Sequence, residues 1–170
     1  MKGTPAAFEL QMQYLKAMYE EKIPFNKILG FEVETLSVSK VVVHFEMRAD
    51  LIGNYFLETL HGGVISSVLD ATGGLSVSVS LLEKLQGEPV EEIEKRMAHI
   101  GTIDLRVDYL RPGRGKTFQA VSSIMRTGRK VAVTRMELHN EESVLVAVGT
   151  GTYIVGCDLP SLLRAHSKIS

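Results

Sequence analysis

The chain has 170 residues, 45% of them hydrophobic, and a formal net charge of −1. This length is enough for one buried core but not for two comfortable ones, and the near-neutral charge excludes an overall basic field of the kind that holds nucleic acids or anionic membranes. The only cysteine, Cys157, excludes an intramolecular disulfide and a cysteine-rich metal site. We therefore expect one domain over residues 1–170 in the reducing cytoplasm, without a secretion signal, a metal site, a nucleic-acid partner or a membrane partner.

The first predicted element is an N-terminal helix over about residues 5–23. Pro5 is typical of a first helical turn, and apolar residues then recur at helical spacing until Pro24 interrupts the pattern. The apolar stripe favours simple packing against a core, with a lid over a ligand as the alternative.

Two strands and a loop are predicted next. β-Branched residues dominate residues 31–47, in two runs that meet near residues 37–40, which indicates two strands. Residues 51–60 are predicted to form a loop with a turn at Gly53-Asn54, leading into a helix that opens near His61.

A long helix is predicted over about residues 61–85. Length and context favour a helix, although the alternation over residues 76–80 would also suit a strand. The segment approaches bilayer-spanning length, but Asp70 would be costly in lipid, so a buried helix of a soluble domain is favoured over a membrane span. Its many small residues disfavour an isolated helix and suggest that a sheet packs closely around it.

The C-terminal half is predicted to hold a short insert and four strands. Residues 86–98 favour a solvated helical loop over an acidic partner-binding tail, because the acidic run is short and mixed in sign. From Gly101 the pattern becomes alternating, which predicts a half-buried strand with Ile103, Leu105, Val107 and Tyr109 on one face. Three more strands, separated by turn-forming residues, are predicted over residues 118–125, 130–138 and 144–155.

These elements predict an α+β fold. An antiparallel sheet of about six strands needs a cover on one face, and the central helix is the only element large enough to supply it. The core is expected over about residues 31–155, between the short N-terminal helix and a short C-terminal tail.

The start of the central helix carries the first candidate site. The first N–H groups of a helix lack intrahelical partners and lie at the positive end of its dipole, so His61-Gly62-Gly63 can bind an anion. Glycine at 62 and 63 lets a substrate carbonyl approach these N–H groups, as an oxyanion hole requires. For His61 itself, a capping role is favoured over proton transfer, because a protonated base is unfavourable at a positive helix end.

Asp70 is the candidate acid–base residue. It follows His61 by nine residues, which places the two side chains ~180° apart around the helix and ~13 Å apart along it. They cannot act on one carbon within a single chain, so a shared site requires two copies of the helix side by side, and hence a homodimer. The alternative is an ordinary carboxylate that faces solvent or caps a loop.

Two segments resemble the phenylacetic-acid-degradation (PaaI-like) family of hot-dog thioesterases. Residues 54–70 contain a loop asparagine, then His-Gly-Gly, then an aspartate nine residues after the histidine. Residues 101–112 resemble the family's next strand, with Thr102 at a position that often carries serine or threonine. The likeness extends over about residues 31–155 and implies the hot-dog fold, in which a sheet wraps around a long central helix.

The resemblance also implies an activity, the hydrolysis of an acyl-CoA thioester, with coenzyme A as part of the substrate and no other cofactor. The Gly62 N–H would hold the carbonyl oxygen, with Asn54 nearby. Asp70 of the partner subunit would act as nucleophile, or as base for a water that Thr102 helps to place. The family further implies that two such dimers pair into a tetramer.

A coenzyme A substrate calls for basic residues near its phosphates. Two groups, each around a predicted turn, are candidates for this role, and ordinary charged hairpin ends are the alternative. The first group is Arg111, Arg114 and Lys116, and the second is Arg126, Arg129 and Lys130.

Two other functions stay open. A hot-dog dehydratase or hydratase would bind a similar thioester, but such enzymes often place a histidine five residues after the acid, where this chain has Leu75. A non-catalytic acyl-CoA sensor would need an effector module, for which roughly 30 residues before the first strand are too few. The apolar residues Phe56, Leu57, Val64 and Val68, together with the N-terminal helix, favour a fatty or aromatic acyl group over a small polar one.

Overall fold

The computed structural model describes residues 5–156, so the expected C-terminal tail lies outside the described residues. The helical elements are α1 (Pro5–Ala17), the π-helix η1 (Met18–Lys22), α2 (Pro24–Leu29), the 3₁₀ turn η2 (Ala49–Leu51), α3 (Gly62–Lys84) and α4 (Val90–Met97). The strands are β1 (Glu32–Leu36), β2 (Val41–Glu46), β3 (Ile52–Asn54), β4 (Thr59–Leu60), β5 (Gly101–Tyr109), β6 (Thr117–Thr127), β7 (Val131–Asn140) and β8 (Leu145–Ile154).

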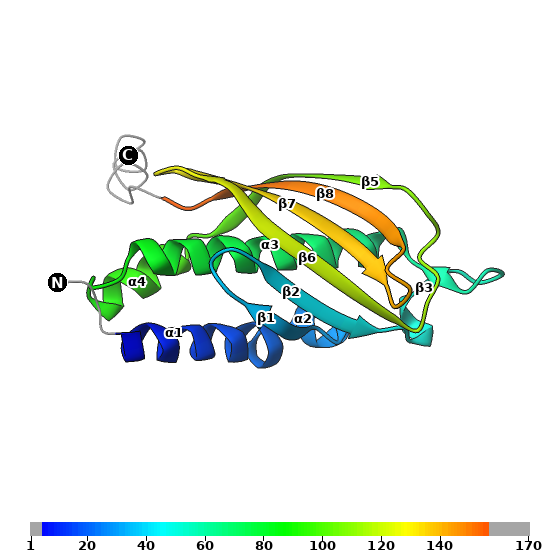
Figure 1. The fold of residues 1–170 in the computed structure, drawn as a ribbon, viewed down its shortest axis with the longest axis horizontal. Helices are drawn as coiled ribbons and strands as arrows, with labels where there is room; N and C mark the ends of the chain where they lie inside the picture. Colours follow the sequence, from blue (N-terminus) through cyan, green and yellow to red (C-terminus); the bar gives the residue numbers. More distant parts are fainter. Residues whose placement is uncertain (1–4, 157–170) are drawn as a thin grey trace, which may run out of the picture.

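One six-stranded antiparallel sheet covers the central helix. Its strand order is β1-β2-β6-β7-β8-β5, and every neighbouring pair is antiparallel. The sheet curves along α3, while α1 and α2 lie beside β1 along one long edge of the molecule (Figure 1). The predicted α+β hot-dog fold is therefore confirmed, and the strands predicted after residue 100 end within two residues of the observed ones.

The central helix α3 is a core element over its whole C-terminal half. It begins after His61 and ends at Lys84, and residues 72–82 are all buried, so the segment 76–80 is helix and not strand. The helix is long and apolar enough to cross a membrane, but 67% of its most apolar stretch is buried inside the protein. It is thus the buried core helix that the sequence favoured.

Small residues on α3 allow the close packing that was predicted. A Cβ atom at Gly73 would overlap the Tyr153 hydroxyl and the Met136 sulfur on the facing strands. The Tyr153 hydroxyl donates a hydrogen bond to the backbone carbonyl of Asp70 at 3.0 Å, across this contact. Glycine at 73 therefore lets the sheet approach the helix backbone directly.

The N-terminal region differs from the prediction at Pro24. We expected a single helix that ends there, but α1 and η1 end at Lys22, and Pro24 begins the separate helix α2. Proline suits a first helical position, because its missing N–H would be unpaired there in any case. Met12 and Leu15 of α1 are buried in the core, as the packing interpretation of the apolar stripe predicts for these two residues.

The segment before α3 is a hairpin and not the predicted loop. Strands β3 and β4 pair antiparallel, and the turn falls at residues 55–58 rather than at Gly53-Asn54. Gly53 lies in β3, where a Cβ atom would overlap the backbone of His61. Glycine is therefore required at position 53 because the strand packs closely against the start of α3, and not because the chain turns there.

Candidate active site

His61 caps the N-terminus of α3. Its backbone is extended, and its Nδ1 accepts a hydrogen bond from the Gly63 N–H at 2.8 Å. A Cβ atom at Gly63 would lie only 2.9 Å from this nitrogen, so a larger residue at position 63 would clash with the imidazole in its capping position. The capping role favoured for His61 is present, and it occupies the Gly63 N–H, which is therefore not free to bind a substrate.

Among the first N–H groups of α3, the Gly62 N–H is the one that remains free to bind a substrate. The N–H groups of Val64 and Ile65 donate to the His61 carbonyl, whereas within residues 5–156 the Gly62 N–H has no acceptor. The Gly62 carbonyl accepts a hydrogen bond from the Tyr109 hydroxyl at 3.1 Å, which ties the helix start to the end of β5. A cavity of about 370 Å³ opens here, lined by Thr59, Leu60, Gly62, Ile65, Tyr109, Leu110, Arg111, Pro112 and Gly113.

Asp70 lies two turns further along α3, beside the other end of β5. The Thr102 hydroxyl donates a hydrogen bond to Asp70 Oδ1 at 2.9 Å. Within the described residues, Asp70 Oδ2 accepts no hydrogen bond, which leaves it available to a ligand or water. Thr102 and Asp70 are therefore in direct contact within one chain, while the expected role of Thr102 in placing a water stays a prediction.

A β-bulge in β5 directs Thr102 toward Asp70. Between Thr102 and Asp104 the register against β8 gains one extra residue, Ile103. Leu105 packs partly buried against the core, and Thr102 also contacts the helix, although simple alternation would place these two positions on opposite faces. Ile103 is 58% exposed, so its predicted place on the buried face is wrong.

A cavity of about 270 Å³ adjoins Asp70. Burial raises the pKa of the Tyr19 hydroxyl to about 12, opposed by its hydrogen bond with Ser78 and reinforced by the charge of Asp70. Burial, together with the Asp70 charge, also raises the pKa of Tyr153. Both phenols therefore stay protonated near neutral pH and act as walls and hydrogen-bond donors, not as bases. The lining residues are Tyr19, Ile23, Phe25, Asn26, Ser67, Asp70, Ala71, Gly74, Ile100, Gly101, Thr102 and Tyr153.

One chain keeps the two candidate groups apart. Gly62 and Asp70 are eight residues apart on α3, or ~12 Å along its axis. They line two different cavities that share no residue. The separation inferred from residue spacing therefore holds in the folded chain, and no single chain brings the amide and the carboxylate to one point.

The structure places Asn54 at the end of β3, directly before the hairpin turn. Its Oδ1 accepts hydrogen bonds from the N–H groups of Phe56 at 3.0 Å and Leu57 at 3.1 Å. This pattern stabilises the turn and leaves the side-chain amide nitrogen of Asn54 as the group that could meet a ligand.

The apolar residues predicted to line an acyl pocket are dispersed. Phe56, at the hairpin tip, is 92% exposed, and Leu57 beside it is also exposed. Val68 lies fully in the core, and Val64 lines a separate groove next to His61. The N-terminal region, also expected to help form the pocket, contributes Tyr19 to the cavity beside Asp70. Tyr153 was missed, because it stands far from Asp70 in the sequence and had no motif around it.

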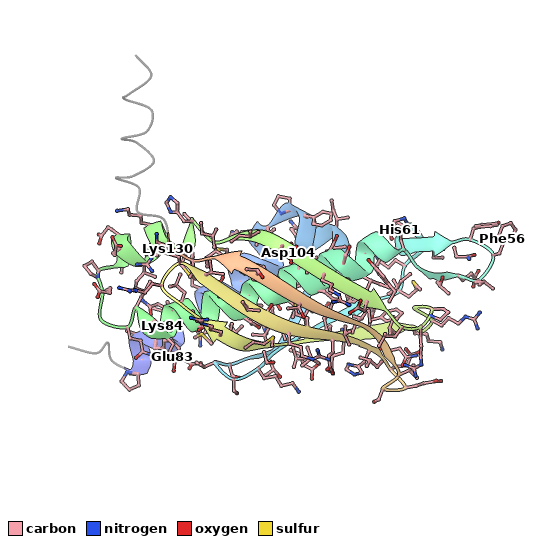
Figure 2. The ribbon with its side chains drawn as sticks, turned by 90° about the horizontal axis from the view of Figure 1, so that it is seen from above. Phe56, His61, Glu83, Lys84, Asp104 and Lys130 are labelled. Carbon is pink, nitrogen blue, oxygen red and sulfur yellow. The ribbon has the colours of Figure 1, made fainter. Side chains whose placement is uncertain are left out.

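The two basic groups lie at opposite ends of the molecule. Arg111 lines the cavity of Gly62 and donates to the Leu145 carbonyl at 2.9 Å. The turn that carries Arg126, Arg129 and Lys130 lies at the C-terminal end of α3, where Lys84 donates to the Thr127 carbonyl. Figure 2 shows Lys84 and Lys130 near one end of the molecule and His61 near the other. Within residues 5–156, no group of histidine, cysteine and acidic residues is arranged to hold a metal.

Comparison with known proteins adds independent findings. Residues 57–147 match the family described as the thioesterase superfamily. A protein of Escherichia coli named medium/long-chain acyl-CoA thioesterase YigI is 44% identical over 148 residues, which cover 87% of this chain and 96% of that protein. A crystal structure from Shewanella oneidensis, related to the thioesterase superfamily, has a TM-score of 0.86 and 40% identity, covering 90% of this chain and 100% of that one. A mutant of the phenylacetic acid degradation protein PaaI from Thermus thermophilus has a TM-score of 0.61 and 28% identity, covering 78% of this chain and 98% of that one.

Proposed function

The chain belongs to the thioesterase superfamily, and from that premise we propose that it hydrolyses medium- and long-chain acyl-CoA thioesters at a site shared between two subunits. The substrate class follows the name of the Escherichia coli relative, which covers most of this chain. The sequence left a fatty or an aromatic acyl group open, and the relative's name favours the fatty one.

The observation that carries the shared site is the pair of hydrogen bonds at the two ends of β5. Thr102, near the start of the strand, holds Asp70, and Tyr109, at its end, holds Gly62. β5 is an edge strand with β8 on one side only. If two copies pair antiparallel through β5 about a two-fold axis at Arg106, with Ile103 as the extra residue, the Thr102 end of one strand lies beside the Tyr109 end of the other. Asp70 of one subunit then approaches Gly62 of the other.

The exposed side chains of this edge support such a pairing. Ile103 is 58%, Tyr109 53% and Leu110 48% exposed along or just after β5. A sheet edge with unpaired backbone groups and apolar side chains is a template for another strand, and a twin subunit would cover it. The pairing of such dimers into a tetramer, which the PaaI-like resemblance implies, is part of the same proposal.

The chemistry follows from these positions. The Gly62 N–H, at the positive end of α3, donates to the thioester carbonyl oxygen and stabilises the negative charge that develops there. Asp70 of the partner subunit acts on the thioester carbonyl carbon in one of two ways. As a base, it takes a proton from a water whose oxygen attacks the carbon; as a nucleophile, it forms an anhydride that water then hydrolyses. In both routes the C–S bond breaks, and the coenzyme A thiolate leaves and takes up a proton.

The proposed dimer also suggests where the basic groups lie relative to one site. Arg111, Arg114 and Lys116 lie at the Gly62 end of their own subunit. In the antiparallel dimer, the partner's turn bearing the second basic group is brought toward that same end. We propose that both groups are available to the coenzyme A phosphates of one site, with Arg111 nearest to the Gly62 amide.

A panel of acyl-CoA substrates tests the proposed function. Release of free thiol is measured for acetyl-, butyryl-, octanoyl-, palmitoyl- and phenylacetyl-CoA. We expect kcat/KM to be highest for the octanoyl and palmitoyl substrates, because the cavity beside Asp70 is largely apolar. An absence of turnover with every substrate would contradict the proposal, and a monomer in sedimentation at working concentration would contradict the shared site.

A further inference from the structure

The hairpin β3–β4 ends in three exposed apolar residues, Tyr55, Phe56 and Leu57, which we call the hairpin tip. Their side chains are 84%, 92% and 51% exposed, in that order. The tip is nevertheless well organised, because Asn54 Oδ1 accepts the N–H groups of Phe56 and Leu57, and the Tyr55 and Phe56 rings meet edge to face at a centroid distance of 5.9 Å. Three consecutive large apolar side chains held in water indicate a surface that another molecule covers.

The base of the hairpin fixes its direction. The His61 N–H donates to the Leu51 carbonyl at 2.8 Å, and the Leu60 N–H donates to the Gly113 carbonyl at 3.0 Å. The first bond ties the hairpin to the start of α3, and the second ties it to the segment that follows β5. In both views the hairpin continues beyond the start of α3 along the long axis of the molecule, with Phe56 at the far end (Figures 1 and 2). The tip therefore projects from the β5 edge, away from its own subunit.

In the proposed dimer, the hairpin of one subunit lies along the α3 helix of the other. The two β5 strands run antiparallel, so the partner's α3 passes Gly62 and continues in the direction of this hairpin. The partner's Ser78, eight residues after Asp70, lies ~12 Å beyond that carboxylate. The four residues from Leu60 to Phe56 span ~13 Å at the rise of a strand. The tip therefore reaches the level of the partner's Ser78.

The cavity beside Asp70 is open on the side that this hairpin faces. Thr102, at the start of β5, is exposed, and Phe25 is 53% exposed, although both line the cavity. The inner end is closed by Tyr19, whose hydroxyl forms a hydrogen bond with Ser78 Oγ at 3.2 Å. The volume of about 270 Å³ is also smaller than the roughly 300–1,000 Å³ of typical ligand sites. A long acyl chain thus needs a further wall, which one chain does not supply.

We propose that the hairpin tip of one subunit covers the open side of the partner's Asp70 cavity and forms the wall that a long acyl chain contacts. The inference rests on the proposed function and its shared site. Phe56 and Leu57 then line an acyl pocket, as expected from the sequence, but in a site whose Asp70 belongs to the partner subunit. Each site takes its tip from the chain that supplies Gly62. The tip determines specificity and is not catalytic.

A double substitution at the tip tests this proposal. We expect Tyr55→Ser/Phe56→Ser to lower the palmitoyl-to-butyryl ratio of kcat/KM about tenfold or more, because the long chain loses apolar contacts that butyryl does not make. The melting temperature should not change, since both side chains are exposed. The matched control is Leu10→Ser/Tyr14→Ser, which removes two side chains, each 67% exposed, from α1 beside the opposite sheet edge (Figure 1). It should keep the wild-type ratio.

Mixed dimers show which subunit the tip serves. Tyr55→Ser/Phe56→Ser subunits are mixed with an excess of Asp70→Asn subunits, so that nearly every tip variant is in a mixed dimer. The site that keeps Asp70 then takes this carboxylate from the tip variant and its intact tip from the other chain. We expect the palmitoyl-to-butyryl ratio to return to the wild-type value. A tip that acts within its own chain would leave the ratio at the value of the tip variant.

Several outcomes would overturn the proposal while leaving the proposed function intact. They are an unchanged ratio in the tip variant, an equal loss with both substrates, and a ratio that is not restored in mixed dimers with demonstrated subunit exchange. Binding of the wild type to phosphatidylcholine vesicles that the tip variant loses would assign the tip to a lipid surface instead. A wild-type chain that hydrolyses no acyl-CoA would contradict the proposed function, and the role of the tip with it.

Discussion

Replacing Asp70 with asparagine is expected to lower kcat for acyl-CoA hydrolysis by about a thousandfold, because the amide can neither take a proton from water nor attack the thioester. Asparagine has nearly the same shape and can still accept the hydrogen bond that Thr102 donates to Oδ1. The fold and the cavity should therefore persist. Thiol release under saturating substrate, together with the melting temperature of the variant, measures the effect.

The matched control is Glu83→Gln. It removes a carboxylate from the same helix, at the exposed C-terminal end that is distant from both cavities. We expect its kcat to stay within about twofold of wild type, as surface substitutions away from a site have small effects. Equal turnover by Asp70→Asn and Glu83→Gln would show that Asp70 is not catalytic and would favour a non-catalytic binding role for the cavity.

Replacing Gly62 with proline is expected to lower kcat about 10²- to 10³-fold, because it removes the one N–H that we assign to the carbonyl oxygen. The position suits proline in other respects. Gly62 is the first residue of α3, where proline is favoured, and His61 before it is extended with φ −64° and ψ 136°, as a residue preceding proline should be. The helix start and its His61 cap should therefore remain.

Gly62→Ala separates loss of the N–H from loss of the glycine. Alanine keeps the N–H, and its Cβ would lie no closer than 3.6 Å to the Tyr109 ring. We expect most of the wild-type kcat in this variant, with substrate affinity as the quantity that changes. Comparable losses in Gly62→Ala and Gly62→Pro would mean that free space at residue 62, and not its hydrogen-bond donor, is what the reaction needs.

Mixing the two inactive variants tests whether the site is shared. In a heterodimer of an Asp70→Asn subunit and a Gly62→Pro subunit, one of the two sites combines the intact Asp70 with the intact Gly62. Random reassociation of equal amounts should therefore restore about a quarter of wild-type activity, because half of the dimers are mixed and each has one complete site. Activity no greater than that of the separate variants, in a preparation in which subunit exchange is demonstrated, would refute a site built from two chains.

The local elements of this protein were predictable because they depend on side-chain periodicity. Alternation predicted β6, β7 and β8 to within two residues, and the apolar length after His61 predicted α3. The hairpin β3–β4 was missed because its glycine at 53 resembles a turn residue, while its real cause is the approach of the His61 backbone. The helix α2 was missed because proline ends one helix and begins another equally well.

The sequence by itself determined the fold class, the helix that carries the site, and the separation of Gly62 from Asp70, because helical geometry follows from residue spacing alone. Only the tertiary structure decided which residues surround these two groups. The extra residue at Ile103 directs Thr102 to Asp70, and Tyr109 joins Gly62 to the far end of the same strand. Such contacts join residues remote in sequence, and no local pattern encodes them.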